Sequence, residues 1–310
     1  MQFQFLTQPL SSLEYSEWPS TPKCKIYRFS MKKLAKKQFA GERLKQATKE
    51  EQEQICKKYG FKQDTQKIDL SYKHLGDSGT EDIAKFLAFS SKIKHINLKS
   101  NSLGKLASEY LCEALKINKS LEILELQSNE LGKDGAAFLF YTLNQNSLNL
   151  KELNLEFNSI GSEGGDLISQ YLKNMKTQLV KFSLGSNELR DSAILEIIKI
   201  LTNYELNKSI QEVKLHYNEV SDECAAYICE VFEDLIVKHQ PQKSPQNKKS
   251  LDKNNKVQNS LKGNNNSSNA TDISSKLTLK SLDLSMNQFS NKMEMRLDKL
   301  MKSCLKSYKI

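Results

Sequence analysis

The strongest constraint on the fold is a pattern that the chain repeats. Six stretches follow L-x-x-L-x-L-x-x-N-x-L, with other aliphatic residues or Phe in place of some leucines. They cover residues 93–103, 121–131, 150–160, 179–189, 210–220 and 279–289, and a weaker copy covers 67–75, where Lys73 stands in the Asn position. Successive Asn positions lie 28, 28, 29, 29, 31 and 69 residues apart. Self-similarity at such a period indicates a stack of similar units that bury one shared core.

Each unit combines two periodicities. The L-x-L centre alternates apolar and variable residues, which predicts a short strand with one side turned inward. The Asn follows where the chain leaves the strand, and its amide can donate to and accept from backbone groups that the turn leaves unpaired. The second half of the unit has helical spacing, so a helix is expected after each strand. The apolar helix faces that we expect are Leu106, Tyr110, Leu111 and Leu115; Leu139 and Leu143; and Cys224, Ile228, Phe232 and Leu235.

Over residues 61–238 and 277–310 the pattern resembles the leucine-rich repeat family, and its period of 28–29 residues is similar to the ribonuclease-inhibitor-like subclass. The resemblance implies an α/β leucine-rich repeat solenoid, a horseshoe with parallel strands on the concave face and helices on the convex face. It also implies a non-enzymatic interaction module or scaffold that binds a protein partner through the concave face. A structural or adaptor role in a cytoskeletal or ciliary (axonemal) assembly is the expectation that follows.

Both ends of a solenoid need caps, because the terminal units would otherwise expose their apolar faces. We expect an N-terminal helical cap over residues 38–60, because Thr48 and Glu51 have the spacing of a capping box and Gly60 is a typical helix stop. Residues 277–310 are expected to hold the seventh repeat and a final cap helix. The apolar stripe expected on that helix is Leu297, Leu300, Met301, Cys304 and Leu305.

Two segments fit no repeat. Residues 1–37 form an irregular basic arm in this interpretation, either packed over the cap or inserted into a partner. Residues 239–276 are rich in Asn, Lys, Ser and Gln and contain no aromatic residue, so we expect a disordered insertion. That insertion is either neutral or a basic tether to an acidic surface.

The net charge of +9 is unevenly distributed. Residues 1–60 carry 12 basic and 6 acidic side chains, whereas residues 61–237 carry 19 basic and 26 acidic ones. A protein that binds a nucleic-acid duplex needs a basic face on its folded part, so nucleic-acid binding is not expected here. No apolar run approaches the roughly 18 residues that span a bilayer, so no membrane span is expected.

Composition and motifs give no sign of a reaction. The six cysteines form no C-x-x-C pair and the four histidines are scattered, so we predict neither a zinc site nor a disulfide framework, and a reducing, cytoplasmic location. Cys112 and Cys229 are interpreted as core residues. No P-loop, nucleophile elbow, zincin or dinucleotide-binding motif occurs, so no catalytic residue, metal, cofactor or small-molecule substrate is predicted.

The variable positions of the predicted strands are therefore the candidate site. Glu125, Glu152 and Glu156 are expected to form a central acidic patch, flanked by exposed aromatic residues of the type enriched at binding hot spots. The alternative is a solvated charged face with no partner. The complete set of candidate residues is Tyr72, Lys99, Glu125, Gln127, Glu152, Glu156, Phe157, Lys214, His216 and Tyr217.

A second function is a regulator of a small GTPase, because the Ran GTPase-activating protein is similar in fold and repeat class. Two features of the sequence disfavour it. None of the four arginines, Arg28, Arg43, Arg190 and Arg296, lies on a predicted concave strand position, and the C-terminal segment is basic rather than acidic.

Overall fold

The computed structural model describes residues 44, 47–145, 148–173, 175, 178–239 and 273–310. The chain divides into two units, 1–45 and 46–310. Leu44 is the one residue described in the first unit, so the predicted arm over 1–37 lies outside the described residues. We call the second unit the repeat unit.

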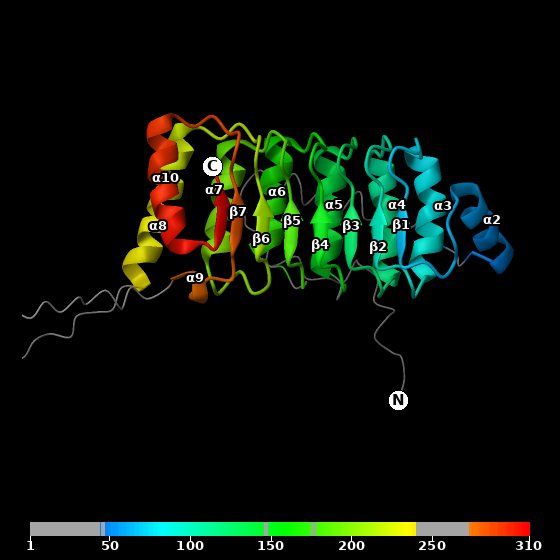
Figure 1. Ribbon diagram of the computed structural model, residues 1–310. Coiled ribbons are helices and arrows are strands. Elements are labelled where there is room, and N and C mark those ends of the chain that lie inside the picture. Colours follow the sequence, from blue (N-terminus) through cyan, green and yellow to red (C-terminus); the bar gives the residue numbers. More distant parts are fainter. Residues whose placement is uncertain (1–43, 45–46, 146–147, 174, 176–177, 240–272) are drawn as a thin grey trace, which may run out of the picture. The chain divides into compact units, whose positions relative to one another are not determined.

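Strands and helices alternate along the repeat unit (Figure 1). Helix α2 (Lys49–Tyr59) comes first. It is followed by β1 (Lys67–Asp69), α3 (Gly76–Phe89), β2 (His95–Asn97), α4 (Lys105–Ile117), β3 (Ile123–Glu125), α5 (Gly132–Gln145), β4 (Glu152–Asn154), α6 (Gly161–Lys173), β5 (Lys181–Ser183), α7 (Arg190–Thr202), β6 (Glu212–Lys214), α8 (Asp222–His239), α9 (Ile273–Lys276), β7 (Ser281–Asp283), α10 (Asn291–Cys304) and β8 (Ser307–Lys309).

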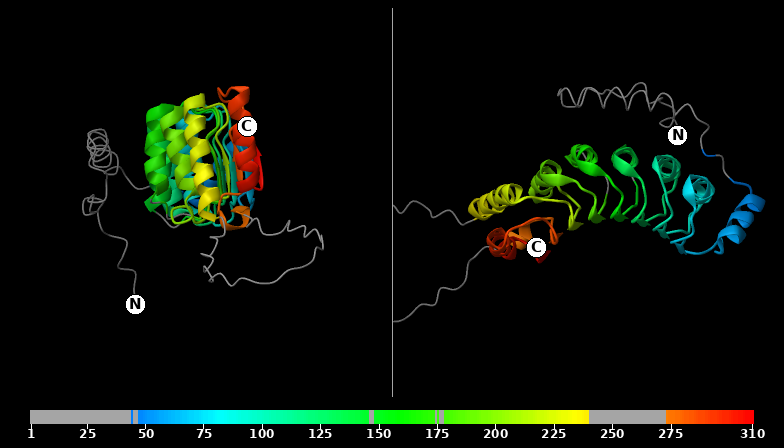
Figure 2. Two further views of the ribbon diagram at one scale, coloured as in Figure 1. Left: turned by 90° about the vertical axis from the view of Figure 1, so that its left-hand side faces the viewer. Right: turned by 90° about the horizontal axis from the view of Figure 1, so that it is seen from above.

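The eight strands form one parallel sheet in chain order, from β1 to β8. The register is constant, so equivalent residues of successive repeats lie side by side, as in the row Ile68, Ile96, Leu124, Leu153, Phe182, Val213 and Leu282. Within the repeat unit, the strands line the inner side of a curve and helices α3 to α8 lie on its outer side (Figure 2). The predicted α/β leucine-rich repeat solenoid is confirmed.

A ladder of asparagines closes the turns after strands β2 to β7. Asn101, Asn129, Asn158, Asn187 and Asn218 are buried. Each side-chain oxygen accepts a hydrogen bond from a backbone N–H of the preceding repeat, and each side-chain nitrogen donates to backbone carbonyls. Asn287 continues the ladder but is only half-buried. The Asn therefore satisfies polar backbone groups that the turns bury.

Most of the expected helix faces are buried, but three expected positions are not, and one of these, Tyr110, is half-buried. Leu111, Leu115, Leu139, Leu143, Cys224, Ile228 and Phe232 belong to the core. Leu106 is 44% exposed, because it lies in the first turn of α4 and the buried side of that helix begins at Ala107. Leu235 is half-buried, because α8 has 18 residues and is longer than the 13-residue α7 beside it.

The two ends contain both expected and unexpected elements. The capping box of Thr48 and Glu51 is present, and Gly60 ends α2 in the left-handed conformation with φ of 75°. Strand β8 was missed, because its sequence lacks the L-x-L spacing. The boundaries 239–276 of the expected insertion are too wide: His239 is the last residue of α8, and α9 places Ile273 in the core. Residues 240–272 lie outside the described residues.

Candidate protein-binding face

The constant register arranges the variable side chains of the sheet in rows. The row at the last strand position contains Asp69, Asn97, Glu125, Asn154, Ser183, Lys214, Asp283 and Lys309. Two residues further along each repeat lies a second row, Ser71, Lys99, Gln127, Glu156, Gly185, His216 and Ser285. A further row, at the first strand position, contains Lys67, His95, Ile123, Glu152, Lys181, Glu212, Ser281 and Ser307. Apart from the buried Ser183, the side chains of these rows lie outside the core, and together the rows form a continuous surface that we call the strand face.

The three glutamates expected as an acidic patch are each paired. Glu125 Oε1 lies 2.6 Å from His95 Nε2, and Glu125 Oε2 accepts a hydrogen bond of 2.9 Å from Gln127. Lys181 Nζ lies 3.8 Å from a Glu152 oxygen and 3.2 Å from a Glu212 oxygen. The strand face is therefore a mosaic of alternating charges rather than an uncompensated acidic patch.

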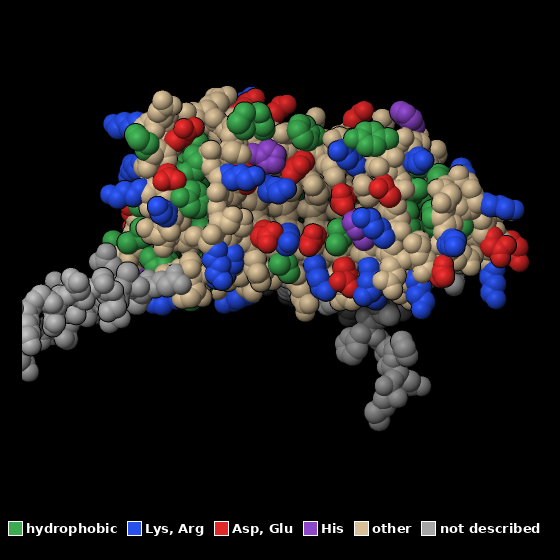
Figure 3. Space-filling model, viewed as in Figure 1, with side chains coloured by type: hydrophobic (Ala, Val, Ile, Leu, Met, Phe, Trp, Pro, Cys, Tyr) green, Lys and Arg blue, Asp and Glu red, His purple; other side chains and the backbone are tan. Residues whose placement is uncertain are grey.

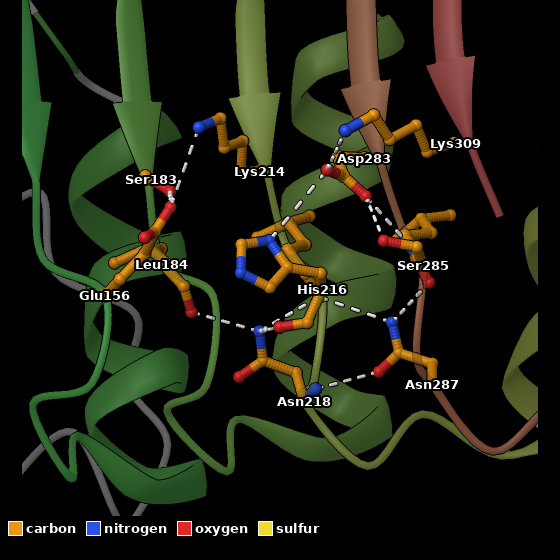
Figure 4. A network of polar contacts seen from close by, with 12 residues as sticks. Glu156, Ser183, Leu184, Lys214, His216, Asn218, Asp283, Ser285, Asn287 and Lys309 are labelled. Atoms are coloured by element: carbon orange, nitrogen blue, oxygen red, sulfur yellow. Dashed lines mark hydrogen bonds and ion pairs between the residues drawn. The ribbon is translucent and has the colours of Figure 1, made fainter.

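Glu156 belongs to a polar network near the C-terminal end of the sheet (Figure 4). It accepts a hydrogen bond from the hydroxyl of Ser183, and Lys214 Nζ lies 3.9 Å from the same carboxylate. In the same repeat as Lys214, His216 Nδ1 lies 4.0 Å from Asp283, which in turn faces Lys309 Nζ at 3.7 Å. Lys214 and His216, both candidate residues, are thus brought into one network.

The position of His216 depends on Gly185. A Cβ atom at Gly185 would lie 2.4 Å from the imidazole ring of His216, so the ring occupies space that any other residue would fill. The signal for this contact is present in the sequence, because Gly185 is the single glycine in its row, but it can be interpreted only once the register is known.

A last row lies at the edge of the sheet, where the chain turns off the strands. It consists of Tyr72, Ser100, Ser128, Phe157, Ser186, Tyr217 and Met286, and each has a positive φ between 52° and 61°. Tyr72 is 62% exposed, Phe157 54% and Tyr217 50%. Bulky side chains are uncommon in this left-handed conformation. We call this row the edge row.

Lys99 and Tyr72 form a pair between the second row and the edge row. Lys99 Nζ lies 5.6 Å from the centroid of the Tyr72 ring, within cation–π range. Hydrogen bonding to Lys99 is the largest cause of a Tyr72 pKa below its usual value. All ten candidate residues therefore lie on the strand face or the edge row; His95, Lys181, Ser183, Asp283 and Met286 are contributors that sequence reasoning did not select.

The described residues contain no group of three or more His, Cys, Asp or Glu side chains placed to hold a metal ion. Cys112 and Cys229 are buried, as predicted, and burial raises the pKa of both thiols, to about 12 for Cys112.

Both described arginines lie off the strand face: Arg190 is 3.4 Å from Glu219, and Arg296 is 2.8 Å from Glu233. Among the helices that the structure describes, none has the length and hydropathy of a membrane-crossing segment.

Comparison with known proteins supports the repeat. Residues 118–140, 146–169 and 275–292 match the family model described as Leucine Rich repeat. No curated protein matches. Among solved structures, the chain titled Leiomodin-1 Actin-Binding Site 2 matches with 21% identity and a TM-score of 0.37, over 43% of this chain and 76% of that one. A match of this strength does not extend to function, and the ribonuclease-inhibitor-like subclass stays a prediction. The chain carries leucine-rich repeats, and its fold is a leucine-rich repeat solenoid.

Proposed function

We propose that the protein is a non-enzymatic interaction module that binds a protein partner across the strand face. One observation carries the proposal: eight strands in constant register present a continuous surface whose side chains, apart from the buried Ser183, lie outside the core. Repeat proteins of this architecture use such extended concave surfaces for binding. We further propose that the partner belongs to a cytoskeletal or ciliary assembly, which stays a prediction from the resemblance.

The chemistry of the strand face supports a protein partner rather than a single-charge ligand. Side chains of both signs alternate along the sheet, as in Glu152, Lys181 and Glu212. Complementary charges at an interface set register and specificity more than raw affinity. The exposed aromatic residues of the edge row supply the kind of side chain that dominates binding energy at hot spots.

The proposal is tested with a variant that removes charges from the strand face only: Glu152→Ala, Lys181→Ala and Glu212→Ala combined. Surface ion pairs contribute about 0–1 kcal/mol each, so the melting temperature should change by only a few degrees, about 2–4 °C. The tagged protein and the variant are expressed in the native cell, and captured proteins are quantified by mass spectrometry. We expect at least one protein to be captured by the wild type and lost with the variant.

A matched control removes an ion pair from the helical side. Lys85 and Glu81 on α3 lie 2.7 Å apart and are exposed to the same extent. The Glu81→Ala, Lys85→Ala variant should capture the same proteins as the wild type. Equal capture by the strand-face variant would contradict the proposal, and localisation of the tagged protein away from cilium and cytoskeleton would contradict the proposed assembly.

A further inference from the structure

In the edge row, the exposed ring of Tyr72 contacts a cation of the same chain. Tyr72 is the aromatic residue of the first repeat, and the backbone N–H of Tyr72 donates to the carbonyl of Lys99 at 2.9 Å. The same Lys99 places its ammonium group over the Tyr72 ring. At this end of the row, a cation from the next repeat therefore covers the exposed ring.

The equivalent cation is missing further along the row. Phe157 N–H donates to the carbonyl of Gly185 at 3.1 Å, and Tyr217 N–H donates to that of Ser285 at 3.2 Å, so Gly185 and Ser285 occupy the position of Lys99. Neither has a charged side chain. Within the described part of the chain, no lysine or arginine lies over the ring of Phe157 or Tyr217, and both rings are at least half exposed.

A small residue separates the two rings. Ser186 stands between Phe157 and Tyr217 in the edge row, and its hydroxyl is enclosed without a hydrogen-bond partner. The two aromatic residues belong to repeats two strands apart, which corresponds to about 10 Å at the usual spacing of neighbouring strands. At this separation, a cationic group from another molecule placed between the two rings lies within cation–π range of both.

Two acidic residues follow the edge row in the repeats of Ser186 and Tyr217. Glu188 and Glu219 each lie one residue beyond a ladder asparagine, and both are exposed. Glu219 is partly compensated by Arg190 at 3.4 Å. Figure 3 shows hydrophobic side chains along the edge at which the strands end, with acidic side chains next to them. Residues 61–237 as a whole carry seven more acidic than basic side chains, 26 against 19.

We propose that Phe157, Ser186 and Tyr217, with Glu188 and Glu219, form a docking site for a basic segment of a protein partner. An arginine or lysine of that segment stacks on the two rings, as Lys99 does on Tyr72, and the two carboxylates attract its charge. This inference deepens the proposed function by naming the chemistry of the partner, and it rests on that function.

The first experiment determines which kind of peptide the chain binds, starting from random sequences. Random 12-residue peptides displayed on phage are selected on the full-length chain, and the selected peptides are synthesised with a fluorescent label for anisotropy titrations. We expect enrichment of Arg and Lys over the unselected library, and affinity that falls as salt concentration rises. Selection of uncharged or acidic peptides would overturn the proposal.

The variants replace aromatic residues of the edge row by serine, which other repeats have at the same position. Phe157→Ser and Tyr217→Ser together should weaken a selected peptide by about tenfold or more, from the loss of two cation–π contacts. Serine occupies this position in three repeats with the same positive φ, so the variant should fold normally. Tyr72→Ser is the matched control and should leave the affinity unchanged. Glu188→Gln should weaken binding less than the double variant and reduce its salt dependence.

The outcomes separate this inference from the proposed function. A peptide that loses affinity only with the strand-face variant, Glu152→Ala, Lys181→Ala and Glu212→Ala, overturns the edge site and leaves the proposed function standing. A peptide that is indifferent to both variants contradicts both. If replacing the six lysines of residues 240–272 by Gln strengthens peptide binding, the chain's own basic segment occupies the edge, and the assignment to a partner is wrong.

Discussion

Replacing Asn187 by Ala tests the physical basis of the fold, because this side chain bridges two repeats. Asn187 Oδ1 accepts from the N–H of Asn158 at 2.8 Å, and its Nδ2 donates to the carbonyls of Leu155, Leu184 and Gly185 at 2.8, 3.0 and 3.0 Å. The side chain is fully buried. Alanine can form none of these hydrogen bonds, so the ladder is interrupted at its centre.

The size of the expected loss of stability depends on which backbone groups lose their only hydrogen-bond partner. The three carbonyls keep another donor, which is Asn158 for Leu155, Asn218 for Leu184 and the backbone of Phe157 for Gly185. The N–H of Asn158 keeps none. A buried N–H without a partner costs about 1–3 kcal/mol, and each of the three hydrogen bonds lost from Nδ2 contributes about 1 kcal/mol more, so we expect a destabilisation of about 4–6 kcal/mol.

Urea denaturation followed by circular dichroism measures this change, with Asn287→Ala as the control. Asn287 makes equivalent contacts with Asn218 and Val220, but it is half-buried, so water can replace part of what alanine removes. The control should lose about 1–2 kcal/mol. A loss below about 1 kcal/mol for Asn187→Ala, or equal losses for the two variants, would refute the role of the ladder.

Three further predictions concern backbone conformation, helix packing and thiol chemistry. Arg190 and Gly132 occupy equivalent positions in their repeats, and both have a φ of 62°. In the same denaturation assay, Arg190→Gly should therefore stabilise the fold by about 1 kcal/mol, and Gly132→Ala should destabilise it by a similar amount. Opposite signs would disprove the argument that a side chain is strained at this φ. A Cβ at Gly165 would lie 2.6 Å from that of Ala193, so Gly165→Ala should cost about 1–2 kcal/mol despite its better helix propensity, and no measurable loss would show that α6 and α7 can separate freely. Burial raises the pKa of the Cys112 thiol from 9.0 to about 12, so the thiol of the folded protein stays protonated at pH 9. Iodoacetamide should therefore label Cys112 slowly until urea is added. The stability of the fold should decrease above pH 9, because only the thiol of the unfolded chain ionises there. Rapid labelling of native protein would contradict this assignment.

The repeat spacing was sufficient to predict the parallel sheet, the order of its strands and the asparagine ladder. The reason is that every repeat must bury the same inward positions, so an error of one residue in any unit would have turned its apolar residues outward. Helix faces were predicted less well, as Leu106 shows. Helical spacing alone does not say where a neighbouring helix begins to cover the face.

The candidate face could be predicted as a set of positions but not as a set of interactions. All ten residues lie where the pattern places them, yet the pairing of His95 with Glu125 crosses from one repeat to the next. Such contacts depend on side-chain length and register together. The left-handed backbone of the edge row was also beyond sequence reasoning, because Tyr72 and Phe157 occupy a conformation that large residues seldom adopt.

A photocrosslinking amino acid placed at single positions tests the central claim most directly. Lys214 represents the strand face, Tyr217 the edge row and Lys85 the helical side. The account predicts that, in the native cell, the same partner crosslinks to the first two positions and not to Lys85. Crosslinking of a partner to Lys85, with none at Lys214 or Tyr217, would show that the protein binds through its helices and would contradict the account.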